Sequence, residues 1–192
     1  VLMTPIQLAN MMAAVANEGY YYTPHIIKKI EGEKIEEKYT TKHFTKIDKK
    51  HFKPVIDGLF DVYNLGTAHA LQVDGIEICG KTGTAENYTK INGKRVKLQD
   101  HSIFVAFAPR VNPKIAIAVL IENGYWGARW AGPITSLMIE KYLKGKITRT
   151  DLEKRMLEGS LQAEYAKYTG IKVVDELLLK PATVNPDEPA EN

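Results

Sequence analysis

The sequence predicts an α+β fold, in which an antiparallel sheet of three strands lies between helices that precede and follow it. Three runs of β-type residues, at 75–84, 101–108 and 114–122, are joined by short connections. Segments with apolar residues every three or four positions flank these runs on both sides. The length of 192 residues, with 44% hydrophobic and 26% charged residues, fits one globular domain and excludes a disordered or fibrous chain.

The first helix is expected to begin at Thr4. Thr4 is a good N-cap, Pro5 suits the first helical position, and Gln7 completes a capping box. Gly19 is expected to end the helix. Alanines fill much of the surface between its larger apolar residues, which predicts burial on most sides.

The next two segments differ in character. Residues 20–47 combine β-type residues with isolated apolar positions, which predicts two or three short exposed strands and a turn at 31–32. Residues 48–64 have apolar side chains at helical spacing, and this predicts an amphipathic helix. Asp48 is its expected cap and Gly66 its expected stop.

The second half of the chain begins with the three strands, and the Asn-Pro pair at 112–113 predicts a hairpin between the last two. Residues 130–143 then predict a helix. Its expected apolar face consists of Ile134, Leu137, Met138 and Leu143. Thr150, with Glu153 three residues later, predicts a capping box at the start of a final helix.

Composition narrows the functional classes. The net charge is +3, and no long basic block occurs, so the sequence favours no nucleic-acid partner. Cys79 is the only cysteine, which excludes an intrachain disulfide and a site with several cysteine ligands. The five histidines show no metal-ligand spacing, and we expect no metal and no cofactor.

The motif whose residues could form a reactive or binding site is "CGKTGTAE" at residues 79–86. Lys81 supplies a positive charge, Thr82 and Thr84 supply hydroxyl groups, and the backbone between them supplies N–H donors. Such a set can bind a carboxylate and polarise a carbonyl. Gly80 and Gly83 would let a ligand approach the strand edge. The four letters alone leave a second interpretation open, in which Lys81 is a solvated strand end and the glycines form a bulge.

The "KTGT" sequence resembles the third motif of the penicillin-recognising serine enzymes, K-T-G. Longer segments resemble the same family in the same order, namely "TPIQLANMMAAVANEG", "GLFDVYNLGTA", "DHSIFVAFAPRVNPKIAIAVLIENG" and "WAGPITSLMIEKYL". Over roughly residues 2–145 the chain is similar to the C-terminal half of the transpeptidase domain of class B penicillin-binding proteins. The resemblance is greatest to the elongation-type penicillin-binding protein 2, in a form like that of Bacteroidetes.

This resemblance implies roles for four residues. Lys81 and Thr82 would bind the carboxylate of the terminal D-alanine of a peptidoglycan stem peptide, or of a β-lactam. Thr84 would add its hydroxyl, and its backbone N–H would be an oxyanion-hole donor. Gly83 would leave room for the ligand to run antiparallel to the strand. Loss of one oxyanion donor typically costs about 10² to 10³ in rate.

Two motifs of the family are absent from the sequence: the S-x-x-K that carries the nucleophile and the S-x-N. The three serines, Ser102, Ser136 and Ser160, have neither spacing. We therefore expect the chain to be the C-terminal piece of a longer transpeptidase, inactive by itself. The missing part would supply the nucleophile, a membrane anchor and further strands, so the edge of the 114–122 strand should be open or covered by another chain.

The resemblance predicts a D,D-transpeptidase at the periplasmic face of the bacterial inner membrane, with a glycosyltransferase of the elongation complex as partner. It predicts transpeptidase residues at 1–147, a helical extension at 148–180, and a disordered tail at 181–192. A β-lactamase and a non-enzymatic β-lactam sensor are alternatives, since they share the lysine motif.

Some residues near the motif have two interpretations. Tyr125, Trp126, Arg129 and Trp130 form an aromatic, basic loop that could contact the stem peptide, although packing of the indoles is the favoured interpretation. His101 is expected to be structural, because enzymes of this family use lysine as the base.

Overall fold

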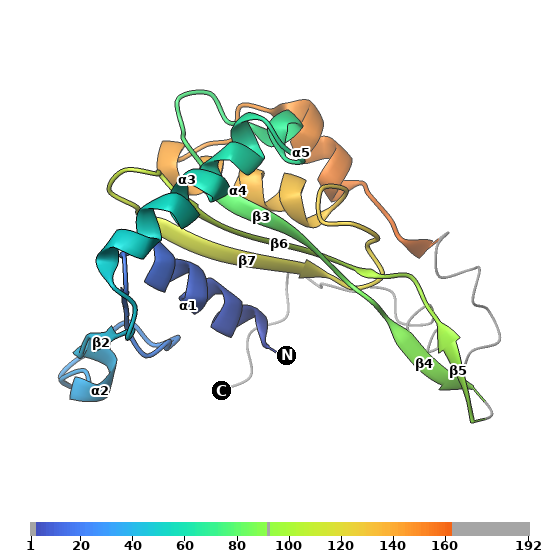
Figure 1. Cartoon of the computed structure of the whole chain (residues 1–192). Helices are drawn as coiled ribbons and strands as arrows, with labels where there is room; N and C mark the ends of the chain where they lie inside the picture. Colours follow the sequence, from blue (N-terminus) through green and yellow to red (C-terminus); the bar gives the residue numbers. More distant parts are fainter. Residues whose placement is uncertain (1–2, 92, 163–192) are drawn as a thin grey trace.

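A computed structural model describes residues 3–91 and 93–162 of the chain. Its central feature is a three-stranded antiparallel sheet (Figure 1) made of β3 (Cys79–Ala85), β6 (His101–Ala108) and β7 (Ile115–Ile121), in the order β3-β6-β7. The predicted α+β fold and antiparallel sheet are confirmed. Within the described residues β7 is an edge strand, as expected for the 114–122 run.

Strand β3 begins later than predicted. The expected strand started at residue 75, whereas the ladder with β6 starts at Cys79. Gly75 has a φ of +69° and lies in a tight turn closed by the pair Val73 and Ile76. A positive φ suits a turn and not a strand, so the chain reverses there before it enters the sheet.

Helix α1 (Pro5–Ala16) begins as predicted, with the complete capping box of Thr4 and Gln7. The expectation of burial on most sides is wrong. Met12 is the one residue of this helix that is buried, while Ile6 and Met11 are 50% and 43% exposed. The helix lies against the face of β6 and β7 (Figure 1) and also contacts β1 and α3.

The segment from 20 to 47 contains less strand than predicted. Two strands of two residues, β1 (Tyr20–Tyr21) and β2 (His43–Phe44), pair with each other, and α2 (Glu37–Thr40) is a short helix where a strand was expected. The turn at 31–32 is confirmed, and Gly32 adopts a φ of +81° there. Isolated apolar residues were too few to specify a strand against the local helical preference of a charged stretch.

The amphipathic helix predicted at 48–64 is confirmed as η1 (Lys49–His51) followed by α3 (Phe52–Asn64), which ends before Gly66. Asp48 occupies the N-cap position of η1 as expected, but its side chain makes no capping hydrogen bond. Its carboxylate instead forms an exposed ion pair with Lys50. A further short helix, η2 (His69–Leu71), leads towards β3.

A second hairpin was not predicted. Strands β4 (Tyr88–Ile91) and β5 (Lys94–Lys97) pair antiparallel and extend away from the main sheet (Figure 1). The dipeptide Asn92-Gly93 in the sequence is a strong hairpin signal that could have identified it.

Two helices follow the sheet, α4 (Ala131–Lys144) and α5 (Thr150–Leu157). The predicted apolar face of α4 is partly wrong, because Met138 is 49% exposed. The buried face includes polar residues instead, with Thr135, Ser136 and Glu140 fully buried. The predicted capping box of α5 is absent: Arg149 is the N-cap and donates no side-chain bond to the helix.

Two apolar clusters lie on opposite faces of the sheet. The larger cluster, on the α4 face, includes Tyr63, Leu71, Phe104 and Ile139. The smaller cluster, on the α1 face, has Met12, Cys79 and Phe107 at its centre. None of the described helices is long and apolar enough to cross a bilayer. Residues 163–180 of the predicted helical extension and the predicted tail at 181–192 lie outside the described residues.

Candidate functional site

The "KTGT" residues lie on an edge strand whose exposure changes along its length. β3 pairs with β6 on one side, and its other side has no strand partner among the described residues. Cys79 and Gly80 are buried, whereas Lys81 and Thr84 are exposed. The motif therefore begins where the strand leaves the core, which allows its side chains and free backbone groups to meet a ligand.

The register of β3 excludes the glycine bulge that was one part of the second interpretation. Each residue from Cys79 to Ala85 pairs in turn with β6, from Phe107 to His101, without an extra residue. The glycines therefore make no bulge. A regular ladder keeps alternate side chains on opposite faces, so Lys81 follows Cys79 on the α1 face while Thr82 lies on the α4 face.

Lys81 and Thr82 are in direct contact. The Lys81 Nζ donates hydrogen bonds to the Thr82 carbonyl at 3.0 Å and to Thr82 Oγ1 at 3.2 Å. The ammonium group is exposed and keeps a further N–H available. The pair presents a cation and a hydroxyl within one short stretch of strand, which suits a carboxylate.

A residue outside the motif also contacts it. Thr67 Oγ1 lies 3.3 Å from Thr82 Oγ1, and either hydroxyl can be the donor. Thr67 belongs to the connection between α3 and η2, 15 residues before Thr82. We did not identify it from the sequence, and the isolated Gly-Thr-Ala at 66–68 gave no physical signal for it.

The two glycines of the motif have different neighbours. A Cβ atom at Gly80 would lie 2.8 Å from the Phe104 ring, so this glycine is required by core packing and not by a ligand. A Cβ at Gly83 would contact only Ile103 of β6, at 3.3 Å. Gly83 therefore remains the candidate for close approach of a ligand, and that role stays a prediction.

A loop after β7 lies directly over the motif strand. A Cβ at Gly127 would be 2.3 Å from the Ile103 carbonyl and 3.0 Å from the backbone nitrogen of Gly83. Ser102 holds this loop in place, because its buried Oγ donates to the Trp126 carbonyl at 2.9 Å and accepts from the Ala131 N–H at 3.1 Å. Ser102 is thus a positioning residue that the sequence reasoning missed.

The aromatic residues of the loop pack in two separate groups. The rings of Tyr125 and Trp126 meet edge to face at 5.9 Å, and the Arg129 guanidinium lies 4.1 Å from the Tyr125 ring centre. Trp130 packs elsewhere, against the backbone at Gly159. Packing therefore accounts for Trp130, whereas Trp126 is 55% exposed beside the motif strand and its contact with a stem peptide stays a prediction.

The groups around His101, at the start of β6, organise the turn that follows β7. The His101 Nδ1 accepts a hydrogen bond from the Asn123 N–H at 3.0 Å. Asn87, just after the motif, donates to Asn123 Oδ1 at 2.7 Å, and the Tyr125 N–H donates to the Asp100 carbonyl. These contacts agree with the structural role predicted for His101.

The remaining reactive side chains are not arranged as a nucleophile. Burial raises the pKa of the Cys79 thiol to about 12, and Cys79 packs with Met12 and Phe107. Ser136 is buried and donates to the Pro133 carbonyl, while the exposed Ser160 accepts from a neighbouring N–H. Among the described residues no three His, Cys, Asp or Glu side chains gather as a metal site.

Comparison with known proteins identifies the family and the fold. The family model described as "Penicillin binding protein transpeptidase domain" matches residues 1–140. The peptidoglycan D,D-transpeptidase MrdA of Acinetobacter baumannii is 34% identical over 148 residues, which are 68% of this chain. The corresponding enzyme PbpA of Mycobacterium tuberculosis is 30% identical over 155 residues, or 76% of this chain.

Solved structures agree. PBP2 of Pseudomonas aeruginosa, in complex with WCK 5153, superposes with a TM-score of 0.59 at 30% identity over 77% of this chain. Penicillin-binding protein A of M. tuberculosis, as an imipenem acyl-enzyme, superposes with a TM-score of 0.58 at 28% identity over 73%. The match spans only 21% of the A. baumannii protein, 30% of PbpA and 32% of the PBP2 structure.

Proposed function

Because the chain belongs to the penicillin-binding protein transpeptidase family, we propose that it is part of a peptidoglycan D,D-transpeptidase of the PBP2 type. The parent enzyme attacks the penultimate D-alanyl carbonyl of a stem peptide with a serine. It releases D-alanine and passes the acyl group to an amine of a neighbouring stem. The serine belongs to the part of the protein outside this chain, because none of the three serines has the S-x-x-K spacing.

In this proposal the chain supplies the carboxylate-binding half of the active site. Lys81 and Thr82 bind the terminal carboxylate of the stem peptide or of a β-lactam. Gly83 leaves the strand edge accessible, and Thr84 contributes its hydroxyl and its backbone N–H to the oxyanion hole. The observation that carries the proposal is the regular ladder of β3, which leaves Lys81 and Thr84 exposed on an edge strand.

The domain organisation, partners and location of the full-length protein follow from the proposed function. Residues 1–147 complete the transpeptidase domain, residues 148–180 form a helical extension, and residues 181–192 form a tail. The remainder of the same protein is the first partner, and a glycosyltransferase of the elongation complex is the second. The enzyme works at the periplasmic face of the inner membrane, with an anchor outside this chain.

Labelled penicillin tests the proposal on the full-length protein. A stable adduct that survives for hours and is reduced by a competing stem peptide is the expected result. Replacing Lys81→Ala should slow acylation by about 10²-fold at penicillin concentrations below saturation, because the carboxylate loses its charged partner and binding weakens. The matched control is Lys90→Ala, which removes an exposed lysine from the neighbouring hairpin and should leave the rate unchanged.

Two results would contradict the proposal. Rapid hydrolysis of the penicillin would indicate the β-lactamase alternative, and a stable adduct without competition by stem peptide would favour a sensor. The isolated 192-residue chain should form no covalent adduct. A stable adduct on any of its residues would disprove the assignment of the nucleophile to the rest of the protein.

A further inference from the structure

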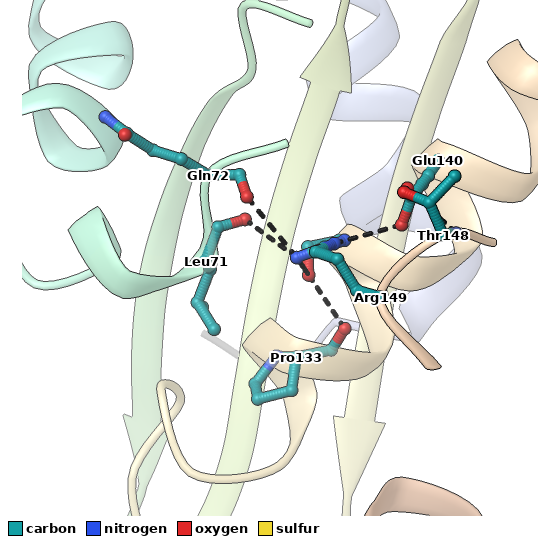
Figure 2. Close-up of polar contacts among 7 residues, drawn as sticks. Leu71, Gln72, Pro133, Glu140, Thr148 and Arg149 are labelled. Carbon is teal, nitrogen blue, oxygen red and sulfur yellow. Dashed lines mark hydrogen bonds and ion pairs between the residues drawn. The ribbon is translucent and has the colours of Figure 1, made fainter. Parts of the chain in front are cut away.

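A fully buried carboxylate on α4 holds the start of α5. Glu140 accepts hydrogen bonds from the Thr148 N–H at 3.2 Å, from Thr148 Oγ1 at 2.5 Å and from the Arg149 Nε at 3.0 Å (Figure 2). Burying a charge is costly unless it is paired and hydrogen-bonded, and here both conditions are met. Glu140 therefore fixes the position of the Arg149 guanidinium.

The guanidinium in turn joins α4 to a segment far away in the sequence. Its Nη1 donates to Ser136 Oγ at 3.1 Å and, at a longer 3.4 Å, to the carbonyls of Leu71 and Gln72 (Figure 2). Those two carbonyls lie at the end of η2, 78 and 77 residues before Arg149. One side chain thus connects the start of α5, the buried face of α4 and the segment before β3.

The segment 67–72 links this arginine to the motif strand. At its far end the carbonyls meet Arg149, and at its near end Thr67 Oγ1 lies 3.3 Å from Thr82 Oγ1. The segment is compact between these points, because Ala68 is buried and Leu71 N–H donates to the Ala68 carbonyl at 2.9 Å. A displacement of the carbonyls therefore changes the place of the Thr67 hydroxyl.

We propose that Arg149 is a positioning residue of the active site: through the segment 67–72 it sets the Thr67 hydroxyl that orients Thr82 beside Lys81. The inference rests on the proposed carboxylate-binding role of Lys81 and Thr82. Arg149 lies beyond residue 140, where the match to the family model ends, although its partner Glu140 is the last matched residue. The contacts from Arg149 through the segment 67–72 to Thr82 therefore connect the proposed active site to a part of the chain that the family match does not cover.

The first experiment measures acylation of the full-length protein by labelled penicillin, separated into the binding constant and the rate of the acylation step. Arg149→Met should weaken binding about tenfold with little change in the acylation step, because Lys81 and Thr82 bind the carboxylate and do not attack the carbonyl. Arg149→Lys should recover only part of the loss, since a lysine lacks the planar fork. The matched control, Arg155→Met, removes an exposed guanidinium from α5 and should bind like the wild type.

A double variant tests whether the weaker binding comes only from an unpaired charge at Glu140. Arg149→Met leaves Glu140 buried without its charged partner, which destabilises the fold by itself. The paired variant Glu140→Gln with Arg149→Met buries no unpaired charge but still lacks the donors to Leu71 and Gln72. Binding that stays about tenfold weaker supports the proposal, and binding restored to the wild-type value overturns it.

A double-mutant cycle tests the route. Thr67→Val removes the hydroxyl that contacts Thr82 and should weaken penicillin binding by a similar factor. If Arg149 acts through Thr67, the two changes together should cost little more than either alone. Multiplied effects would show that Arg149 acts by another route and would overturn the inference.

The failure of this inference is distinguishable from the failure of the proposed function. If the wild-type protein forms no penicillin adduct, the proposed function is contradicted. Hydrogen exchange then tests separately whether Arg149 fixes the segment 67–72. In that case the amides of Ala68 and Leu71 should exchange faster in Arg149→Met than in Arg155→Met. Equal exchange in both variants would show that Arg149 does not fix the segment. If the wild type is acylated and Arg149→Met binds penicillin equally well, the positioning role alone is overturned.

Discussion

The two faces of the β3-β6-β7 sheet differ in how completely the described residues cover them. On the α4 face, residues from α3, η2 and α4 enclose Phe104, and even the carboxylate of Glu140 is buried, where Thr148 and Arg149 donate hydrogen bonds to it. On the α1 face, the buried cluster is confined to Met12, Cys79 and Phe107, and Ile6 and Met11 on α1 are exposed. The difference indicates that the α4 face carries most of the stability of the described part.

The motif strand serves both faces in different ways. Gly80 lies against Phe104 on the α4 face, whereas Cys79 packs beside Met12 on the α1 face. Lys81, two residues after Cys79, starts on the less covered face and is exposed. Packing thus occupies the first part of the strand and leaves the second part for a ligand.

The largest expected effect comes from removing one large side chain on each face. Phe104→Ala should lower the free energy of unfolding by about 4 kcal/mol, because the cavity forms in a fully enclosed site. Met12→Ala should cost about 2 kcal/mol, since α1 can relax on its exposed side. Urea unfolding of the 192-residue chain measures both, and equal losses would contradict the difference between the faces.

Gly80 allows a second comparison, of smaller size. Gly80→Ala places a Cβ 2.8 Å from the Phe104 ring and from the Val105 carbonyl, and should destabilise the chain by about 2 kcal/mol. The matched control is Gly58→Ala in α3, where a Cβ would meet nothing within 4 Å. That change should stabilise the helix by roughly 0.5 to 1 kcal/mol. Denaturant midpoints that fall by the same amount in both variants would refute the packing role of Gly80.

The buried carboxylate predicts a pH dependence on the α4 face. Burial alone raises the pKa of Glu140, but the hydrogen bonds from Thr148 and Arg149 outweigh it and hold the pKa below its ordinary value of 4.5. The stability from this group is therefore present above pH 4.5 and is lost as the pH falls through the lower pKa of the folded state.

Urea midpoints between pH 7 and pH 3 measure this loss. Glu140→Gln should flatten the acid limb of the curve. Asp57 provides the comparison, because hydrogen bonds from Lys53 and then Arg110 also lower its pKa, but its carboxylate is 36% exposed. Asp57→Asn should change the acid limb less, since exposed ion pairs contribute little. A larger change in Asp57→Asn would reverse the assignment of stability to the α4 face.

The smallest effect concerns the thiol of the α1 face. Because burial raises the pKa of Cys79 to about 12, almost no thiolate forms at pH 8. A maleimide reagent should leave the native chain unlabelled and react fully after unfolding in urea. Met12→Ala opens the cluster beside Cys79 and should speed the reaction. Phe104→Ala should not speed it, when the two variants are compared under conditions that give them the same free energy of unfolding. Rapid labelling of the native wild type would show that the α1 face is open at Cys79.

The regular elements could be predicted because their patterns are local. The 101–108 run has the bounds of β6, and the capping box of Thr4 and Gln7 forms as expected. The misses have physical reasons. Gly75 turns the chain before β3, and the strands of the second hairpin are short and carry several charged residues, so that only the Asn-Gly pair between them signals a hairpin. The buried face of α4 could not be read from hydrophobicity, because it contains Ser136 and Glu140.

The sequence by itself determined the main sheet and the helices around it, the "KTGT" motif and the family, because these depend on residue types at fixed spacings. The tertiary structure alone decided that core packing excludes a side chain at Gly80 but not at Gly83, since the two glycines look alike in sequence but have different neighbours across the sheet. It also placed Thr67 against Thr82 of the motif strand, Ser102 against the loop after β7, and Arg149 against the segment 67–72. Their partners lie 15 to 78 residues away, and only the folded chain brings such polar groups within hydrogen-bond distance.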